Sequence, residues 1–290
     1  MKDYNGKLVV ITGGSSGIGL ACAHAYARLG AHVVIIARDE KKLAEAVQAI
    51  ASARQSNNQK IQAFPADVTD PTAMATCAQT VQQAIGVADI LINSAGVARP
   101  GLFEEMEADL YRWMMDINFL GTVNATKAFL PGMIDRGSGH IVLISSVAGY
   151  LGTYGYTAYG ASKFAIKGFG DALRQELQPK HIDVSVVFPP DTDTPQLAGE
   201  YPYKPPVLVA AEEGSQVMTA DQVAHGILSG VDRKRYIITP GWMSTLYFIL
   251  VGLTGGGLVY SIMDFVFGDA HNKVRRNAGK YNHQDKVQPD

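Results

Sequence analysis

LVVITGGSSGIG, residues 8–19, is a short apolar run that passes directly into a glycine-rich turn. The apolar run predicts a buried strand, and the apolar spacing from Ile18 to Leu29 predicts a helix after the turn. Glycines allow a tight turn and close approach to a ligand, while the first N–H groups of a helix attract an anion. The stretch therefore predicts a loop that binds a diphosphate. Its expected contacts are Gly13, Ser15, Ser16, Gly17, Ile18 and Gly19.

Apolar runs and helical patterns alternate through the next part of the chain. We expect strands at 7–12, 32–37, 61–64, 90–92, 141–144 and 184–188, and helices at 18–29, 39–53, 71–85, 107–135 and 157–178. Uncharged strands that alternate with helices predict a parallel sheet covered on both faces. Such a sheet binds ligands at the carboxyl ends of its strands. The predicted fold class is a single α/β domain with a doubly wound parallel sheet.

The alternation stops after Pro189. Residues 195–218 are rich in Pro, Gly and Glu and are expected to form a substrate lid or loop. One more helix is expected at 220–230 and one more strand at 236–239. We therefore predict a dinucleotide-binding and catalytic domain at 1–240, followed at 241–290 by an apolar appendage and a polar tail.

Residues 236–263 carry no charged side chain, and short basic segments flank them. This run is long enough to cross a bilayer, and basic flanks suit anionic headgroups. A re-entrant or interfacial helix pair turning at 255–257 is an alternative, as is a soluble substrate-binding cap or dimer arm. We expect contact with a membrane surface through 236–268, and a homo-oligomer remains open.

The bulk composition excludes several other classes of protein. The chain has 290 residues, is 47% hydrophobic and has a net charge of -2, so nothing indicates a nucleic-acid partner. Cys22 and Cys77 are too few for a disulfide framework and favour a reducing compartment. No zinc-ligand spacing is present, so no metal is expected. The first predicted strand begins so early that no signal peptide or N-terminal anchor is expected.

The second predicted strand ends at Ala37-Arg38. In a dinucleotide-binding fold, an acidic residue at this place contacts the adenosine ribose of NAD. A guanidinium instead suits a 2′-phosphate, with bidentate geometry. A solvated arginine at a helix start is the alternative. The sequence thus favours NADPH/NADP as the cofactor.

Tyr159 and Lys163 are four residues apart in a predicted helix and so share one of its faces. A free phenol has a pKa of about 10, and a neighbouring cation is expected to draw it towards neutrality. Ser146 ends a predicted strand, where its hydroxyl can polarise a carbonyl. Asn118 lies within a predicted helix, where its amide can hold a water that links Lys163 to solvent. These four residues are the predicted catalytic group.

Asn118, Ser146, Tyr159 and Lys163 are similar in order and spacing to the tetrad of the short-chain dehydrogenase/reductase family. The Gly-x-x-x-Gly-x-Gly spacing of 13–19 also resembles that family, and the resemblance covers about residues 5–240. It implies a Rossmann-type fold. It also implies that Lys163 holds the nicotinamide ribose, Ser146 binds the carbonyl, and Tyr159 delivers a proton as hydride arrives.

The resemblance implies further cofactor contacts at the ends of the strands. Asp67 and Val68 stand where the family contacts adenine. The run 93–96 resembles the family's Asn-Asn-Ala-Gly, with Ser94 as a departure. The remaining implied contacts are Asn93, Ala95, Gly96, Pro189, Thr192 and Thr194.

The run PPDTDTP, residues 189–195, resembles the 3-ketodihydrosphingosine reductases within the family, although Pro190 stands where most members have Gly. This likeness implies NADPH-dependent reduction of a long-chain 2-amino-3-ketone. Asp191 and Asp193 then either meet the substrate ammonium or serve the turn. Another lipophilic substrate is an alternative (a hydroxysteroid, retinoid or 3-ketoacyl thioester), as is a non-catalytic NADP-binding scaffold.

The implied location follows from the lipophilic substrate and the apolar appendage. We expect a cytosol-facing, membrane-associated protein. The membrane would be the endoplasmic reticulum in a eukaryote, and the location would be the inner membrane or cytoplasm in a bacterium.

Overall fold

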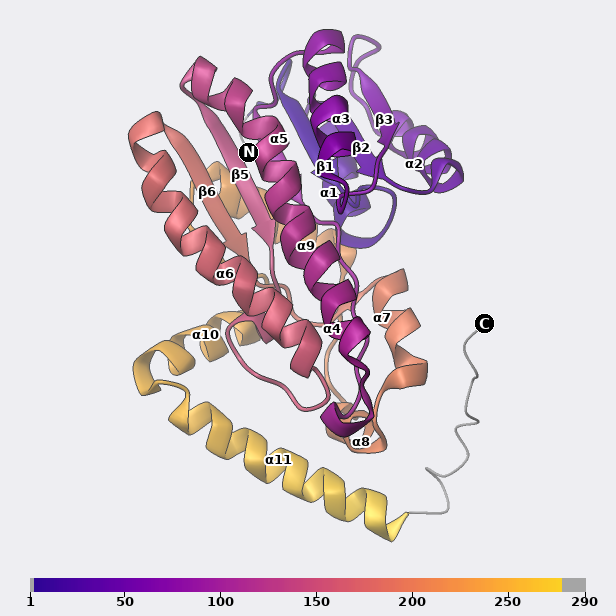
Figure 1. Ribbon diagram of the computed structural model, residues 1–290, viewed down its shortest axis with the longest axis vertical. Helices are drawn as coiled ribbons and strands as arrows, with labels where there is room; N and C mark the ends of the chain where they lie inside the picture. Colours follow the sequence, from indigo (N-terminus) through magenta and orange to yellow (C-terminus); the bar gives the residue numbers. More distant parts are fainter. Residues whose placement is uncertain (1–2, 278–290) are drawn as a thin grey trace.

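The computed structural model describes residues 3–277, and in them one seven-stranded sheet forms the centre of the molecule (Figure 1). The strand order is β3-β2-β1-β4-β5-β6-β9, and every neighbouring pair is parallel. The order reverses between β1 and β4, so the predicted doubly wound α/β fold is confirmed. The strands are β1 (Leu8–Thr12), β2 (His32–Ala37), β3 (Ile61–Pro65), β4 (Ile90–Asn93), β5 (Gly139–Ile144), β6 (Ile182–Val187) and β9 (Ile237–Ile238).

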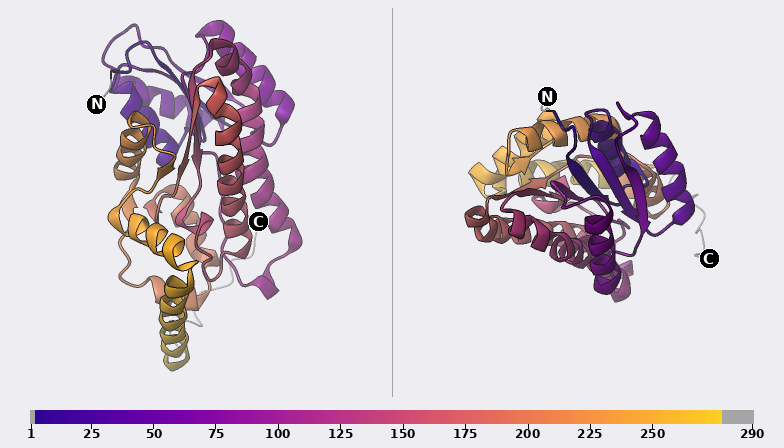
Figure 2. Two further views of the ribbon diagram at one scale, coloured as in Figure 1. Left: turned by 90° about the vertical axis from the view of Figure 1, so that its left-hand side faces the viewer. Right: turned by 90° about the horizontal axis from the view of Figure 1, so that it is seen from above.

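Helices cover both faces of the sheet because successive strand residues point to opposite sides (Figure 2). On β1, Val10 joins the core cluster of one face and Val9 that of the other. The first face is covered by α3 (Pro71–Ala84), α5 (Gly121–Arg136) and α6 (Thr157–Leu177). The second is covered by α1 (Gly17–Ala27), α2 (Glu40–Ser52) and α9 (Ala220–Asp232).

Local capping fixes where several of these helices begin. The Asp39 carboxylate accepts a hydrogen bond from the Lys42 N–H at 3.0 Å at the start of α2. Asp70 caps α3 in the same way, and Pro71 occupies its first turn. Thr219 and Gln222 form a reciprocal capping box at the start of α9.

The predicted helix at 107–135 is interrupted in the structure. It consists of α4 (Ala108–Met115), a π-helical turn at Asp116–Leu120, and α5. Single π-helical turns often mark functional sites, and this one carries Asn118. Apolar periodicity did not reveal the break because the helical rhythm continues through it.

The predicted lid at 195–218 is more ordered than a loop. It contains α7 (Pro195–Glu200), a turn at Tyr201–Tyr203, and α8 (Pro206–Glu212). A proline stands in the first turn of each helix, where its missing N–H costs nothing. Two short strands, β7 (Thr192–Asp193) and β8 (Met218–Thr219), pair in parallel across the base of the segment.

The apolar appendage folds as two helices, α10 (Trp242–Thr254) and α11 (Gly257–Arg276). The chain turns between them at Gly255 and Gly256, whose φ values are +59° and +88°. The structure thus has two helices, as in the alternative prediction, and their placement at a membrane stays a prediction. Within residues 3–277 no helix combines the length and apolarity needed to cross a membrane. The last part of the predicted polar tail, 278–290, lies outside the described residues.

The two appendage helices rest on the body of the protein. On α10, the Phe248 ring lies 5.1 Å from the ring of Tyr150 and 5.5 Å from that of Phe188, centroid to centroid. On α11, Phe267 stacks on Tyr154 at 5.2 Å, and Ala270 packs with residues of α8. Figure 1 shows α11 extending beside α8 at the lower end of the molecule. The appendage therefore packs directly against the lid segment.

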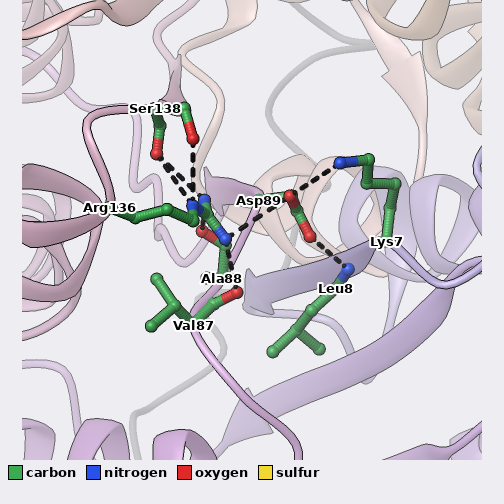
Figure 3. A network of polar contacts seen from close by, with 7 residues as sticks. All are labelled: Lys7, Leu8, Val87, Ala88, Asp89, Arg136 and Ser138. Atoms are coloured by element: carbon green, nitrogen blue, oxygen red, sulfur yellow. Dashed lines mark hydrogen bonds and ion pairs between the residues drawn. The ribbon is translucent and has the colours of Figure 1, made fainter.

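A network of polar contacts joins several elements at the amino-terminal edge of the sheet (Figure 3). The Asp89 carboxylate accepts a hydrogen bond from the Leu8 N–H at 2.8 Å and lies 3.2 Å from the Lys7 ammonium. Arg136, at the end of α5, lies 3.4 Å from Asp89 and donates to the carbonyls of Val87 and Ala88 at 2.9 and 2.6 Å. This network ties β1, the approach to β4 and α5 together at the edge opposite the site described next.

Candidate active site

The glycine-rich loop leaves β1 and turns tightly against the end of β4. The Gly13 N–H donates to the Ile36 carbonyl at 2.8 Å, and its φ of +67° suits glycine. A Cβ on Gly13 would lie 2.7 Å from the Ala95 Cα, and one on Gly19 would lie 2.3 Å from the Gly13 carbonyl oxygen. The loop thus has backbone where side chains would otherwise stand, as a diphosphate cradle requires.

The start of α1 completes this cradle. Ser16 precedes the helix with an extended backbone, and its hydroxyl does not cap the helix. Ser15, Gly17 and Ile18 are partly buried around it. A Cβ on Gly17 would lie 3.1 Å from the Thr194 methyl carbon, so the loop after β6 lies against the same helix start.

Arg38 and Asp67 line one end of an open cleft of about 650 Å³, which also includes Trp113 and Asn124. The Arg38 guanidinium lies 3.7 Å from the Asp67 carboxylate. Partial burial opposes ionisation of Asp67, but hydrogen bonds from Thr69 and the Arg38 charge outweigh it and lower the Asp67 pKa. Both residues therefore present charge to this cleft.

Two of the residues predicted to contact the cofactor are hydrogen-bonded to side chains of α5. Val68 is buried, and its carbonyl accepts a hydrogen bond from the Asn124 amide at 3.0 Å. Asn93 is also buried; its amide nitrogen donates to the Thr126 hydroxyl at 3.2 Å. The Asn93 Oδ1 has no hydrogen-bond partner among residues 3–277. Asn93 therefore holds α5 against β4.

The loop after β4 connects this cleft to the catalytic residues. The Thr12 hydroxyl accepts hydrogen bonds from the N–H groups of Ser94 and Ala95 at 3.2 and 3.3 Å. A Cβ on Gly96 would lie 3.2 Å from the Asn118 Oδ1 and 3.4 Å from the Lys163 Nζ. A side chain here would press on the Asn118 amide oxygen and touch the Lys163 ammonium.

The Asn118 amide is fully buried and makes three hydrogen bonds within the protein. Its Oδ1 accepts from the Val97 N–H at 2.8 Å, and its Nδ2 donates to the Val97 carbonyl and the Ser162 hydroxyl, each at 2.9 Å. The amide thus holds the β4 loop against α6. The protein uses both N–H donors of this amide, so the expectation that the amide holds a water stays a prediction in which the water donates to Oδ1.

Tyr159, Lys163 and Ser146 are brought together at the carboxyl ends of β5 and β6. The buried Lys163 ammonium donates to the Ile144 carbonyl at 3.0 Å and lies 5.6 Å from the centre of the Tyr159 ring. The Ser146 hydroxyl lies close enough to the Tyr159 phenol to lower the pKa of that phenol. A carbonyl oxygen between these two hydroxyls would receive two hydrogen bonds.

Burial lowers the pKa of Lys163 to about 8, with the Glu200 charge acting in the opposite direction. Burial and the charges of Glu200 and Asp191 raise the pKa of Tyr159 above its ordinary value, although hydrogen bonds from Ser146 and Gln196 lower it. The expectation of a lowered phenol pKa is therefore wrong for this set of protein groups. The main reason is burial of the phenol, to which two nearby carboxylates add, and the spacing of Tyr159 and Lys163 gives no sign of either.

Glu200, at the end of α7, is a site residue that the sequence analysis missed. It is buried, and its carboxylate accepts hydrogen bonds from the Tyr156 hydroxyl at 2.8 Å and from the Gln196 amide at 3.2 Å. A glutamate in a segment rich in Pro, Gly and Glu reads as solvated, so no local signal pointed to it. Its burial depends on how the lid segment brings the end of α7 beside Tyr156, the residue just before α6.

The loop after β6 passes beside the same site. The Pro189 carbonyl accepts from the Val147 N–H at 3.0 Å, and the buried Thr192 hydroxyl donates to the Pro190 carbonyl at 2.7 Å. The Thr194 hydroxyl caps α7 by accepting from the Leu197 N–H at 3.3 Å. The loop is therefore fixed at both of its ends.

The two aspartates of this loop are placed differently from Glu200. Both side chains are exposed. Asp191 lies near enough for its charge to raise the pKa of both Tyr159 and Glu200, whereas Asp193 lies on β7.

Comparison with known proteins agrees with this arrangement. The family model described as short chain dehydrogenase matches residues 7–202. A 3-dehydrosphinganine reductase of Danio rerio is 41% identical over 221 residues, which cover 76% of this chain and 67% of that protein. A 3-ketodihydrosphingosine reductase of Mus musculus is 36% identical over 286 residues, which cover 93% of this chain and 86% of that protein.

Solved structures show the same fold. A short-chain dehydrogenase from Sphingobium yanoikuyae in complex with NADPH aligns with a TM-score of 0.74 and 28% identity, covering 88% of this chain and 95% of that one. A short chain dehydrogenase/reductase from Burkholderia phymatum in complex with NAD aligns with a TM-score of 0.75 and 26% identity, covering 87% and 96%. The chain belongs to the short-chain dehydrogenase family of oxidoreductases.

Proposed function

We propose that this protein reduces the 3-keto group of 3-ketodihydrosphingosine, a long-chain 2-amino-3-ketone, with NADPH. The observation that carries the proposal is the pair of Tyr159 and Ser146 hydroxyls in a site bordered by carboxylates. Two relatives that carry the name of this ketone support it, since one of them aligns over 93% of the chain. A site for a cationic ketone needs both an acid for the oxygen and negative charge nearby.

The protein groups divide the chemistry between them. The Ser146 hydroxyl hydrogen-bonds the carbonyl oxygen, and the neutral Tyr159 phenol donates a proton to that oxygen as it gains negative charge. The raised pKa of Tyr159 keeps the phenol protonated before the reaction. The Lys163 ammonium supports the phenolate that is left. When bound, the cofactor supplies the hydride that reaches the carbonyl carbon.

The residues at the strand ends fit a dinucleotide. The cradle at Gly13 and Gly19, which a Cβ would fill, suits the diphosphate. Arg38 suits the 2′-phosphate of NADPH, and Asp67, which lines the same cleft, is assigned to the adenine together with Val68. The other groups assigned to the cofactor are Ser15, Ser16, Gly17, Ile18, Asn93, Ala95, Gly96, Tyr159, Lys163, Pro189, Thr192 and Thr194.

The appendage helices are assigned to a membrane surface on the cytosolic side, where a long-chain substrate would be held. Large apolar side chains are exposed along both helices, with Trp242 71%, Leu253 79% and Phe265 79% exposed. The last turn of α11 carries Lys273, Arg275 and Arg276, which suit anionic headgroups. In this assignment, residues 1–240 form the catalytic domain, and the appendage is the part that contacts the membrane.

The decisive experiment follows the loss of NADPH absorbance on adding 3-ketodihydrosphingosine. The comparison panel holds a ketosteroid, retinal and a 3-ketoacyl thioester. The amino ketone is expected to have the highest kcat/KM of all the compounds tested. A higher value for another ketone would assign a different substrate, and no turnover of any would favour a non-catalytic scaffold.

A further inference from the structure

The Glu200 carboxylate lies close to the catalytic phenol. Its Oε1 accepts from the Gln196 amide at 3.2 Å, and its charge raises the Tyr159 pKa. Its Oε2 accepts from the Tyr156 hydroxyl at 2.8 Å, and the Tyr156 ring lies 5.7 Å from the Tyr159 ring. Glu200 is therefore adjacent to the place where a carbonyl would be reduced.

The surroundings of Glu200 carry more negative than positive charge. Within residues 3–277 no ion pair is formed by Glu200 itself. The buried Lys204 ammonium instead lies 2.5 Å from the Glu212 carboxylate, and Asp191 adds another negative charge. The charge of Lys204 lowers the Glu200 pKa, but among residues 3–277 no cation is directly paired with this carboxylate. A buried carboxylate without a direct ion pair is costly, and such groups concentrate at functional sites. The Glu200 side chain is 5% exposed, so water screens its charge weakly.

Gln196 shows that an N–H donor can reach the Glu200 carboxylate. Its amide N–H group is a neutral donor on an exposed side chain, which can move at small cost. An ammonium in its place would make a charge-assisted hydrogen bond to the carboxylate. In a 2-amino-3-ketone the nitrogen is attached to the carbon next to the carbonyl, so both groups can be satisfied at once.

We propose that Glu200 is the counter-ion of the substrate's ammonium group and selects long-chain 2-amino ketones over ketones that lack the amine. This inference rests on the proposed function and identifies the side chain that binds the substrate's ammonium group. Asp191 adds negative charge at the mouth of the site, whereas Glu200 makes the direct contact. Binding of the cation also offsets the negative charge that opposes ionisation of Tyr159 during proton transfer.

The test compares kcat/KM for 3-ketodihydrosphingosine and for the same ketone with hydrogen in place of the amino group. Glu200→Gln removes the charge and keeps an oxygen that accepts from Tyr156. In Glu200→Gln, the expected loss of kcat/KM is at least tenfold larger for the amino ketone than for the ketone without the amino group. Glu200→Asp keeps the charge and should recover part of the discrimination. Glu176→Gln, the same change at an exposed site on α6, is the matched control.

A purely structural role for Glu200 predicts a different pattern. Tyr156→Phe removes the hydrogen bond and leaves the carboxylate in place. If Glu200 served only to hold Tyr156, Glu200→Gln would keep this hydrogen bond and change kcat/KM little, whereas Tyr156→Phe would lower kcat/KM equally for both substrates. That result would overturn the inference, even with the amino ketone as the wild-type substrate.

An inhibition arm separates this inference from the proposed function. Octadecylamine should compete with the amine-free ketone in the wild type, and octadecanol should compete less well. Glu200→Gln should lose the preference for the amine. If the wild type fails to reduce the amino ketone, the proposed function is wrong. Equal inhibition by amine and alcohol in the wild type would then refute Glu200 as an ammonium site.

Discussion

Replacement of Arg38 by alanine tests cofactor choice directly. The guanidinium lies at the end of β2 beside the cleft and 3.7 Å from Asp67. NADPH and NADH differ only by the 2′-phosphate, so a group that reads this phosphate should affect one cofactor and spare the other. Arg38→Ala is therefore expected to weaken NADPH binding and leave NADH binding nearly unchanged.

The size of the effect follows from the exposure of the side chain. A hydrogen bond to a charged group contributes about 1.5–3 kcal/mol, which corresponds to roughly ten- to a hundredfold in affinity. Because Arg38 is 65% exposed, we expect the lower half of that range. Its ion pair with Asp67 is exposed too, so its loss should cost less than about 1 kcal/mol of folding stability.

The assay is a fluorescence titration of each cofactor, repeated at two salt concentrations. Thermal unfolding checks that the variant is folded, and Arg54→Ala, which removes an exposed arginine just beyond α2, controls for net charge. The NADPH-to-NADH affinity ratio should fall in Arg38→Ala alone. An unchanged ratio would refute the assignment of Arg38 to the 2′-phosphate.

Three further predictions concern the acid–base pair and the appendage. Tyr159→Phe should lower kcat by about 10²–10⁴ while cofactor affinity is unchanged, and near wild-type turnover would remove the phenol from the mechanism. Burial lowers the pKa of Lys163 to about 8, so its ammonium is lost as pH rises through that value. The kcat/KM profile should fall there, and a fall only near the ordinary lysine pKa would contradict the effect of burial. The protein should pellet with liposomes, more so with anionic lipid, and Leu253→Glu with Phe265→Glu should return it to the supernatant. Equal pelleting of this double variant would exclude the appendage as the membrane contact, and a self-associating but lipid-free wild type would indicate a dimer arm.

The buried strands were predictable because parallel strands covered on both faces are almost entirely apolar. Val33 to Ile36, for example, have no exposed surface. The end of each strand was less certain, and β9 has only two residues where four were expected. Strand order could not be read from apolar patterns, because those patterns carry no information about which strands are neighbours.

The catalytic residues were predictable for a different reason. Tyr159 and Lys163 are close in sequence and lie on one helix, so spacing alone places them together. Glu200 reaches the same site only because α7 folds back, and nothing near it in the sequence indicates burial. The role of the Asn118 amide was also missed, since its partner Val97 is fixed by a loop rather than by helical spacing.

The Asp89 network has a consequence for how this enzyme can change. It joins β1, the approach to β4 and α5 at the amino-terminal ends of the strands (Figure 3). The reacting groups lie at the carboxyl ends. Substitution of Asp89 or Arg136 should therefore lower the amount of folded enzyme in a cell, while the kcat of each folded molecule is unchanged. Conversely, the segments around α7 and α8 are free to acquire preferences for new ketones without loss of this anchorage.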